Sequence, residues 1–264
     1  MLRTGVAILA IMAVAAVFGP ALSPYDPAAQ ILPLRLDGPS LQHPFGLDEL
    51  GRDILARVLA GARISFVVGL TVVTISATVG TILGAIAGYF GGLVDDAISR
   101  VVDTLLAFPG LLLSIALVAV LGPSLTNVLL ALTVVGWVGY ARLVRGQVLR
   151  AREFEYVQAA KALGAGAVRV LWRHVIPTAL PAVVVQATLG MAGAIIGEAA
   201  LSFLGLGVQP PTPSWGTMLN GGRAHLLDAP HLTIFPGLAI ALLVLGFNFV
   251  GDGFRDLADP KGQR

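Results

Sequence analysis

The chain contains no cysteine and few charged residues. Its 264 residues include 17 Lys and Arg and 15 Asp and Glu, which leaves a formal net charge of +2. The absence of cysteine excludes disulfides, thiolate metal sites and a cysteine nucleophile. The small net charge argues against a nucleic-acid partner, because such partners are bound through many phosphate contacts. A charged fraction of only 12% is well below that of an ordinary soluble domain.

Nucleotide-binding and catalytic motifs are also missing. No stretch matches the phosphate-binding pattern G-x-x-x-x-G-K-[ST], and neither Lys161 nor Lys261 follows a glycine-rich run. All four histidines lie in loops or at the edges of apolar runs, which excludes an intramembrane serine–histidine pair. A metal site at His43, His225 and His231 is conceivable, but their scatter in the sequence leads us to expect none. We therefore expect no catalytic activity, no cofactor and no metal.

The sequence does contain long apolar runs. Hydrophobic residues make up 56% of the chain and the mean hydropathy is +0.85, which indicates an integral membrane protein. Five stretches carry no Asp, Glu, Lys or Arg, and a helix needs about 20 apolar residues to cross a bilayer. The longest stretch, 104–141, contains the turn signal Gly122-Pro123-Ser124 and divides into two. We expect one all-α membrane domain over residues 1–264, with six transmembrane helices at 5–22, 64–90, 104–121, 125–144, 180–205 and 232–251.

The first apolar run has two interpretations. Arg3 and the small residues at 19–23 are compatible with a cleaved signal peptide. The length of the run and the lack of a clear A-x-A triplet favour a retained helix, which places both termini on one side. With that side inside, 12 of the 17 basic residues face the cytoplasm and five face outward. We therefore expect cytoplasmic termini and a cytoplasmic loop at 145–179, between the fourth and fifth helices.

This loop contains the stretch EYVQAAKALGAGAVRVLWRHVIP, residues 155–177. Apolar residues recur at helical spacing on both sides of Gly164, and Pro177 marks the return to an apolar run. The pattern predicts two short amphipathic helices joined by a glycine bend. One interpretation is a helix lying on anionic lipid, and the other is a projection that fits a groove on a cytoplasmic partner. Periodicity alone does not separate the two.

Other polar and small residues suggest further roles. Residues 48–59 are amphipathic and predict an interfacial helix on the outer side, while Gly80, Gly84 and Gly88 predict close helix packing.

Glu198 is the one acidic residue well within an expected span, where a charge is costly and must face protein or water. It is either a group on a translocation pathway or a residue of helix packing. The pathway candidates are Glu198 and, on the same helix face, Met191 and Ser202.

Three motifs carry a resemblance to a known family. The run Gln158-Ala159-Ala160, followed by Gly164 and then Ile176-Pro177, resembles the EAA loop of binding-protein-dependent ABC importer permeases. The stretches HPFGLDELGRDILARVLAGARIS at 43–65 and LSFLGLGVQPPTPSWGTML at 201–219 resemble the dipeptide/oligopeptide/nickel branch of that family. The similarity covers nearly the whole chain. Gln158 departs from the pattern, because the family usually has a glutamate there.

The resemblance implies a function and a set of partners. It implies a permease subunit in a bacterial or archaeal plasma (inner) membrane, assembled with a second homologous permease, two ATP-binding subunits and an extracytoplasmic substrate-binding protein. Peptides are favoured as substrate over nickel or another small solute, and an ATP-independent channel or secondary transporter is the alternative class. The loop would couple the chain to the ATPase. The coupling residues implied are Glu155, Gln158, Ala159, Ala160, Lys161, Gly164, Ile176 and Pro177.

Overall fold

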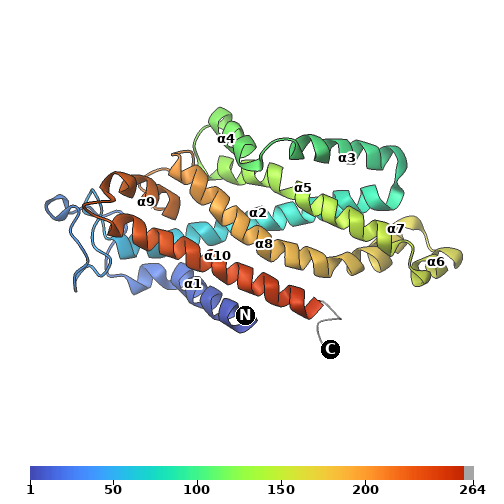
Figure 1. The fold of residues 1–264 in the computed structure, drawn as a ribbon, viewed down its shortest axis with the longest axis horizontal. Coiled ribbons are helices and arrows are strands. Elements are labelled where there is room, and N and C mark those ends of the chain that lie inside the picture. Colours follow the sequence, from blue (N-terminus) through green and yellow to red (C-terminus); the bar gives the residue numbers. More distant parts are fainter. Residues whose placement is uncertain (259–264) are drawn as a thin grey trace.

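The computed structural model describes residues 1–258, which form an elongated bundle of helices (Figure 1). Five helices are long and apolar enough to cross a membrane, and a sixth span results if one bent pair is counted as one. The long helices are α1 (Leu2–Leu22), α2 (Ile54–Phe90), α5 (Leu125–Ala151), α8 (Ile176–Phe203) and α10 (His231–Ala258). The shorter helices are α3 (Gly92–Leu106), α4 (Gly110–Leu121), α6 (Glu155–Ala162), α7 (Ala167–Val170) and α9 (Trp215–Gly222).

Helices α2 and α5 pack closely at the centre of the bundle. A Cβ atom at Gly84 would collide with the backbone of Ala141, and one at Gly88 would lie 2.9 Å from the carbonyl oxygen of Arg145. Because glycine has no side chain, the two backbones approach more closely than larger residues would allow. The packing role predicted for this glycine face is confirmed.

Helices α1 and α10 lie side by side (Figure 1). A Cβ atom at Gly253 of α10 would meet Leu2 at 2.6 Å, and one at Gly5 of α1 would meet Phe249 at 2.8 Å. The N-terminal end of α1 is therefore next to the C-terminal end of α10. Which side of the membrane these two helix ends face stays a prediction.

The third expected span is not one straight helix. Helices α3 and α4 meet at an angle of 86°, with the break at residues 107–109. Pro109 has no backbone N–H and disfavours helical geometry in the residue before it, so the helix stops there and restarts at Gly110. Helix α3 begins at Gly92, twelve residues before the expected start at 104. Asp95 on it pairs with Arg145 of α5.

The other spans also differ in length from the expected ranges. Helix α2 begins at Ile54 instead of residue 64, and α5 continues to Ala151 instead of 144. Helix α8 begins at Ile176, because Pro177 lies in its first turn, where a missing N–H costs nothing. The connection between α5 and α8 is accordingly shorter than the expected 145–179. We call residues 152–175 the α5–α8 loop.

The stretch before α2 does not form the expected interfacial helix. Leu47 and Asp53 form an antiparallel bridge across a tight turn, and Asp53 then caps α2 by accepting a hydrogen bond from Ala56 N at 2.7 Å. Only residues 54–59 of the expected helix are helical, and they are the first turns of α2. The prediction was wrong because the polar residues of this stretch face protein.

Five polar residues around this turn are buried in two groups: His43 with Asp53, and Asp48 with Arg52 and Arg57. We call the second group the charged cluster. Asp48 Oδ2 lies 2.7 Å from Arg52 Nε and 3.4 Å from Arg57 Nε. His43 Nδ1 lies 2.8 Å from Asp53 Oδ2. Pairing within the cluster replaces contact with water, which is the condition under which charged side chains can be buried.

Candidate functional site

The α5–α8 loop is the first of two candidate sites. Helix α6 ends at a turn in which Gly164 has φ +85°, a left-handed conformation that favours glycine. Across this turn Ala165 N donates to Ala160 O at 3.1 Å. The chain then forms α7 and a π-helical turn, Leu171–Val175, and continues directly into α8. The sequence-predicted arrangement of two short helices and a glycine bend matches these elements.

Apolar side chains of the loop are buried in the main hydrophobic core of the bundle. Val157, Val170 and Val175 are fully buried. Tyr156 Oη donates to the carbonyl oxygen of His174 at 3.2 Å, which joins the beginning of α6 to the end of the loop. The loop is thus a folded unit that continues into α8.

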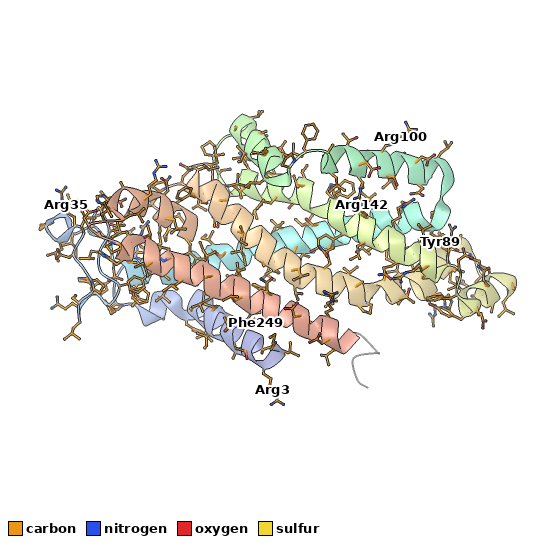
Figure 2. All side chains as sticks on the ribbon, in the orientation of Figure 1. Arg3, Arg35, Tyr89, Arg100, Arg142 and Phe249 are labelled. Atoms are coloured by element: carbon orange, nitrogen blue, oxygen red, sulfur yellow. The ribbon has the colours of Figure 1, made fainter. Side chains whose placement is uncertain are left out.

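The exterior of the same loop is also apolar. Leu163 is 90% exposed and Trp172 is 56% exposed, and Val168 lies exposed between them in the sequence. Figure 1 shows that α6 projects beyond the ends of the long helices. Lys161 Nζ lies 5.5 Å from the centre of the Tyr89 ring, within the range of a cation–π interaction. Figure 2 shows Tyr89 at this end of the bundle, where it links α2 to the loop.

The predicted coupling residues divide into two groups. Exposed members lie on α6, at its end and in the first turn of α8, and they are Glu155, Gln158, Ala159, Lys161, Gly164 and Pro177. Ala160 is half-buried, and Ile176 is buried in the core. The Gln158 side chain is held in place, because its Nε2 donates to the carbonyl oxygen of Arg152 at 2.8 Å. Neither Gln158 nor Glu155 forms an ion pair within the described residues.

The predicted pathway residues lie in helix contacts. Ser202 Oγ donates to Glu198 Oε1 at 2.6 Å, and both side chains are fully buried. Glu198 Oε2 has no hydrogen-bond partner in the described part of the chain. A Cβ at Gly216 of α9 would lie 2.7 Å from Ser202 Cβ, so this pair sits where α9 packs on α8. Met191 is buried against Gly69 of α2.

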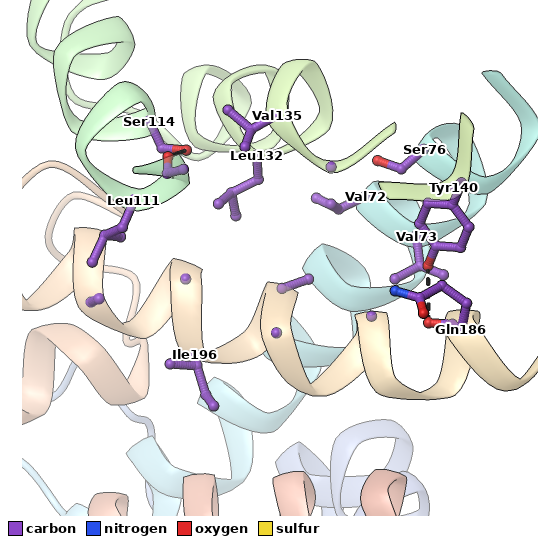
Figure 3. A pocket seen from close by; sticks show the side chains of 17 residues that line it. Val72, Val73, Ser76, Leu111, Ser114, Leu132, Val135, Tyr140, Gln186 and Ile196 are labelled. Atoms are coloured by element: carbon purple, nitrogen blue, oxygen red, sulfur yellow. Dashed lines mark hydrogen bonds between the residues drawn. The ribbon is translucent and has the colours of Figure 1, made fainter. Parts of the chain in front are cut away.

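A cavity of about 390 Å³ between α2, α4, α5 and α8 is the second candidate site. Figure 3 shows its lining, which includes Ser76, Tyr140 and Gln186. None of the three predicted pathway residues lines it. The sequence analysis missed these polar residues, although Gln186 gave a signal, since an amide side chain in a charge-free run is uncommon and costly in lipid.

The histidines have separate surroundings. His43 pairs with Asp53, while His225 Nδ1 lies 3.0 Å from Asp228 Oδ2. His231 Nε2 lies 3.3 Å from the carbonyl oxygen of Leu47. Over residues 1–258, no group of three potential metal-binding side chains comes together.

The sequence is similar to known transport proteins. Residues 80–263 match the family described as binding-protein-dependent transport system inner membrane component. Residues 2–44 match the N-terminal TM domain of oligopeptide transport permease C. The chain is 48% identical over 257 residues to the dipeptide transport system permease protein DppC of Alkalihalophilus pseudofirmus, covering 97% of this chain and 84% of that protein. It is 47% identical over 262 residues to the glutathione transport system permease protein GsiD of Escherichia coli, covering 99% and 86%.

The fold is also similar to solved structures. One is an inward-facing conformation of the MetNI methionine ABC transporter, with a TM-score of 0.58 and 20% sequence identity. The match covers 78% of this chain and 96% of the matched chain. At this level of identity the likeness concerns the fold, and it includes most of the helical bundle.

Proposed function

The chain belongs to the family of binding-protein-dependent transport system inner membrane components, and from this premise we propose that it is the permease subunit of an ATP-driven importer of di- or oligopeptides. Two relatives that cover nearly the whole chain are named for dipeptide and glutathione transport, and glutathione is itself a short peptide. These names support a peptide substrate over nickel or another small solute.

We propose three kinds of partner subunit for this chain, in addition to the lipid bilayer. The family description names a binding protein, which supports an extracytoplasmic substrate-binding partner. The sequence has no phosphate-binding loop, so two ATP-binding subunits would supply the energy. A second homologous permease would complete the pathway. The distribution of basic residues supports cytoplasmic termini and a cytoplasmic α5–α8 loop in the plasma membrane.

One observation supports a coupling role for the α5–α8 loop: the loop has apolar side chains that are buried and others that are exposed on its surface. The buried valines keep the loop folded, and the exposed Leu163, Val168 and Trp172 are then not needed for its own core. A folded projection with an apolar exterior is suited to helix-in-groove binding. Because the loop continues into α8 without a flexible connection, movement of a partner bound to it would be transmitted to that span.

Glu198 fits a packing role better than a pathway role. Its carboxyl is fully buried beside Ser202, at the contact between α8 and α9, and does not face the cavity. We propose that it is a packing residue of α8, held by Ser202 one turn along the same helix at the place where α9 packs. Met191 contacts α2 in the same region of the bundle.

The coupling proposal is tested by substitution of Leu163 with aspartate. A charge there opposes burial in a groove, and a buried leucine contributes about 1.5–3 kcal/mol, so we expect about 10- to 150-fold weaker association with the ATPase. Co-purification with the ATP-binding subunits and ATP-driven dipeptide uptake are measured together. Because Leu163 is almost fully exposed, the permease itself should fold as before.

Leu227 provides the matched control. It is 100% exposed and lies in the connection between α9 and α10, near the opposite end of the bundle. Leu227→Asp should leave association and uptake unchanged. Normal assembly and normal uptake by Leu163→Asp would show that the loop does not dock on the ATPase through this surface, and cross-linking of the loop to lipid alone would support the interfacial alternative.

A further inference from the structure

The cavity between α2, α4, α5 and α8 opens on one side of the bundle. Leu111 of α4 and Ile196 of α8 line it and are about half exposed, so they mark its mouth. Figure 3 shows both side chains toward one end of the cavity, with Tyr140 of α5 and Gln186 of α8 at the other end. Its volume of about 390 Å³ lies at the lower end of the range of about 300–1,000 Å³ that small-molecule sites occupy. It can hold one or two residues of an extended chain.

The cavity contains an unsatisfied polar group. Ser76 is only 1% exposed, and its Oγ has no hydrogen-bond partner among residues 1–258. Tyr140 Oη donates to the carbonyl oxygen of Gln186 at 3.4 Å, a long bond that leaves the hydroxyl oxygen available as an acceptor. Ser114, by contrast, is satisfied by the carbonyl oxygen of Gly110 at 3.0 Å. The remaining lining is mostly aliphatic.

One glycine in the wall leaves open space. A Cβ atom at Gly193 would have no atom within 4 Å, although Gly193 lines the cavity. A Cβ at Gly136 would instead meet Ser76 Oγ at 2.6 Å, and one at Gly190 would collide with Tyr140 Oη. Gly136 and Gly190 are therefore required by close packing. Gly193 keeps the cavity wide without contributing to packing.

We propose that this cavity binds an apolar side chain of a peptide in transit and that Gly193 sets the size of side chain accepted, with Ser76 and Tyr140 bonding the peptide main chain. The proposal rests on the peptide-import function proposed above. The unpartnered hydroxyl of Ser76 favours a peptide over a lipid chain as occupant. A peptide offers both N–H and C=O groups to it, whereas an acyl chain would leave it buried and unbonded.

The test narrows the cavity in steps with Gly193→Ala, Gly193→Val and Gly193→Leu. The assembled transporter with its partner subunits is placed in liposomes, and uptake of dialanine and diphenylalanine is compared. We expect diphenylalanine uptake to fall progressively, by about tenfold or more for Gly193→Leu, because pockets discriminate side-chain size by factors of this order. Dialanine uptake should stay within twofold of the parent protein.

Gly139→Leu is the matched control. A Cβ at Gly139 of α5 also has no atom within 4 Å, but this glycine does not line the cavity. It should leave the uptake of both peptides within twofold. In addition, Ser76→Ala should lower the uptake of both peptides to a similar extent, because it removes a main-chain bond without changing the width.

Several results would overturn the proposal. A size-selecting cavity would be contradicted if the Gly193 series lost uptake of both peptides equally or left both unchanged. It would also be contradicted if Gly139→Leu changed the selectivity in the same way. Loss of co-purified phospholipid from Gly193→Leu without any change in peptide preference would identify a lipid site instead. If the unsubstituted transporter imports neither these dipeptides nor longer peptides, the proposed function itself fails, which is distinguishable from all of these outcomes.

Discussion

The two ends of the bundle depart from the usual placement of residues in opposite ways. At the end that carries α9, charged residues including Asp48, Arg52 and Arg57 are buried and paired with one another. At the end that carries α6, large apolar residues such as Leu163 and Trp172 face outward. The charges of the cluster are paired within the chain, although Arg57 Nε forms no hydrogen bond among residues 1–258. The exterior of the α5–α8 loop, by contrast, gains stability only when another molecule covers it.

The difference predicts where each end is sensitive to mutation. Changes in the charged cluster should affect the stability of the isolated subunit, because the groups they disturb are already buried. Changes on the exterior of the α5–α8 loop should affect assembly, and only those in its backbone turns or internal bonds should affect its own stability. Three substitutions, each with a matched control, test this contrast.

Asp48→Asn should have the largest effect. The substitution keeps the shape of the side chain but leaves Arg52 and Arg57 buried without their shared counter-charge, and breaking a buried pair costs about 3–5 kcal/mol. Thermal unfolding of the purified subunit in detergent would measure the loss. Asp103→Asn is the control, because Asp103 and its partner Arg142 are both largely exposed and such pairs contribute about 0–1 kcal/mol. Equal shifts in unfolding temperature would show that the buried charged cluster matters no more to stability than an exposed ion pair.

Gly164→Ala should have an intermediate effect confined to the α5–α8 loop. The positive φ of Gly164 costs a residue with a Cβ about 1–2 kcal/mol, even though the space around it is free. Gly166→Ala is the control, because Gly166 has φ −63° and equally free surroundings, so alanine fits and reduces the freedom of the unfolded chain. Hydrogen exchange over residues 155–175 should quicken in the first variant only. Similar exchange in both variants would show that the turn is not a fixed element.

Apolar periodicity predicted most of the long helices, but it did not predict the bend in one span or the contacts of the polar residues. Charge-free runs located the long helices, and the four-residue glycine spacing identified the face of α2 that packs on α5. A hydropathy profile reports how long a run is, so it did not reveal the 86° bend that Pro109 introduces. Helical periodicity also cannot tell charges that face water from charges that face each other. For this reason residues 48–53 were wrongly expected to lie on lipid.

The two candidate sites also differ in how far they could be predicted from the sequence. The α5–α8 loop is local in sequence, so its helices, its bend and its exposed residues could be predicted from one stretch. The cavity brings together Ser76 of α2, Tyr140 of α5 and Gln186 of α8, which are distant in the chain. Only the packing of these helices makes them neighbours. Glu198 attracted attention because it is acidic, yet the one side chain that bonds it, Ser202, lies a single helical turn away on the same helix.

Gln158→Glu should have the smallest effect and tests whether the loop's internal bonds matter. Gln158 Nε2 donates to Arg152 O at 2.8 Å, and a glutamate cannot donate, so the loop should lose about 0.5–1.5 kcal/mol. Gln147→Glu is the control, because Gln147 Oε1 accepts from Arg150 at 2.6 Å and a carboxylate can accept equally well. Faster hydrogen exchange over residues 155–163 is expected in Gln158→Glu alone. If both variants exchange alike, the Gln158 amide is not what holds α6 against the end of α5.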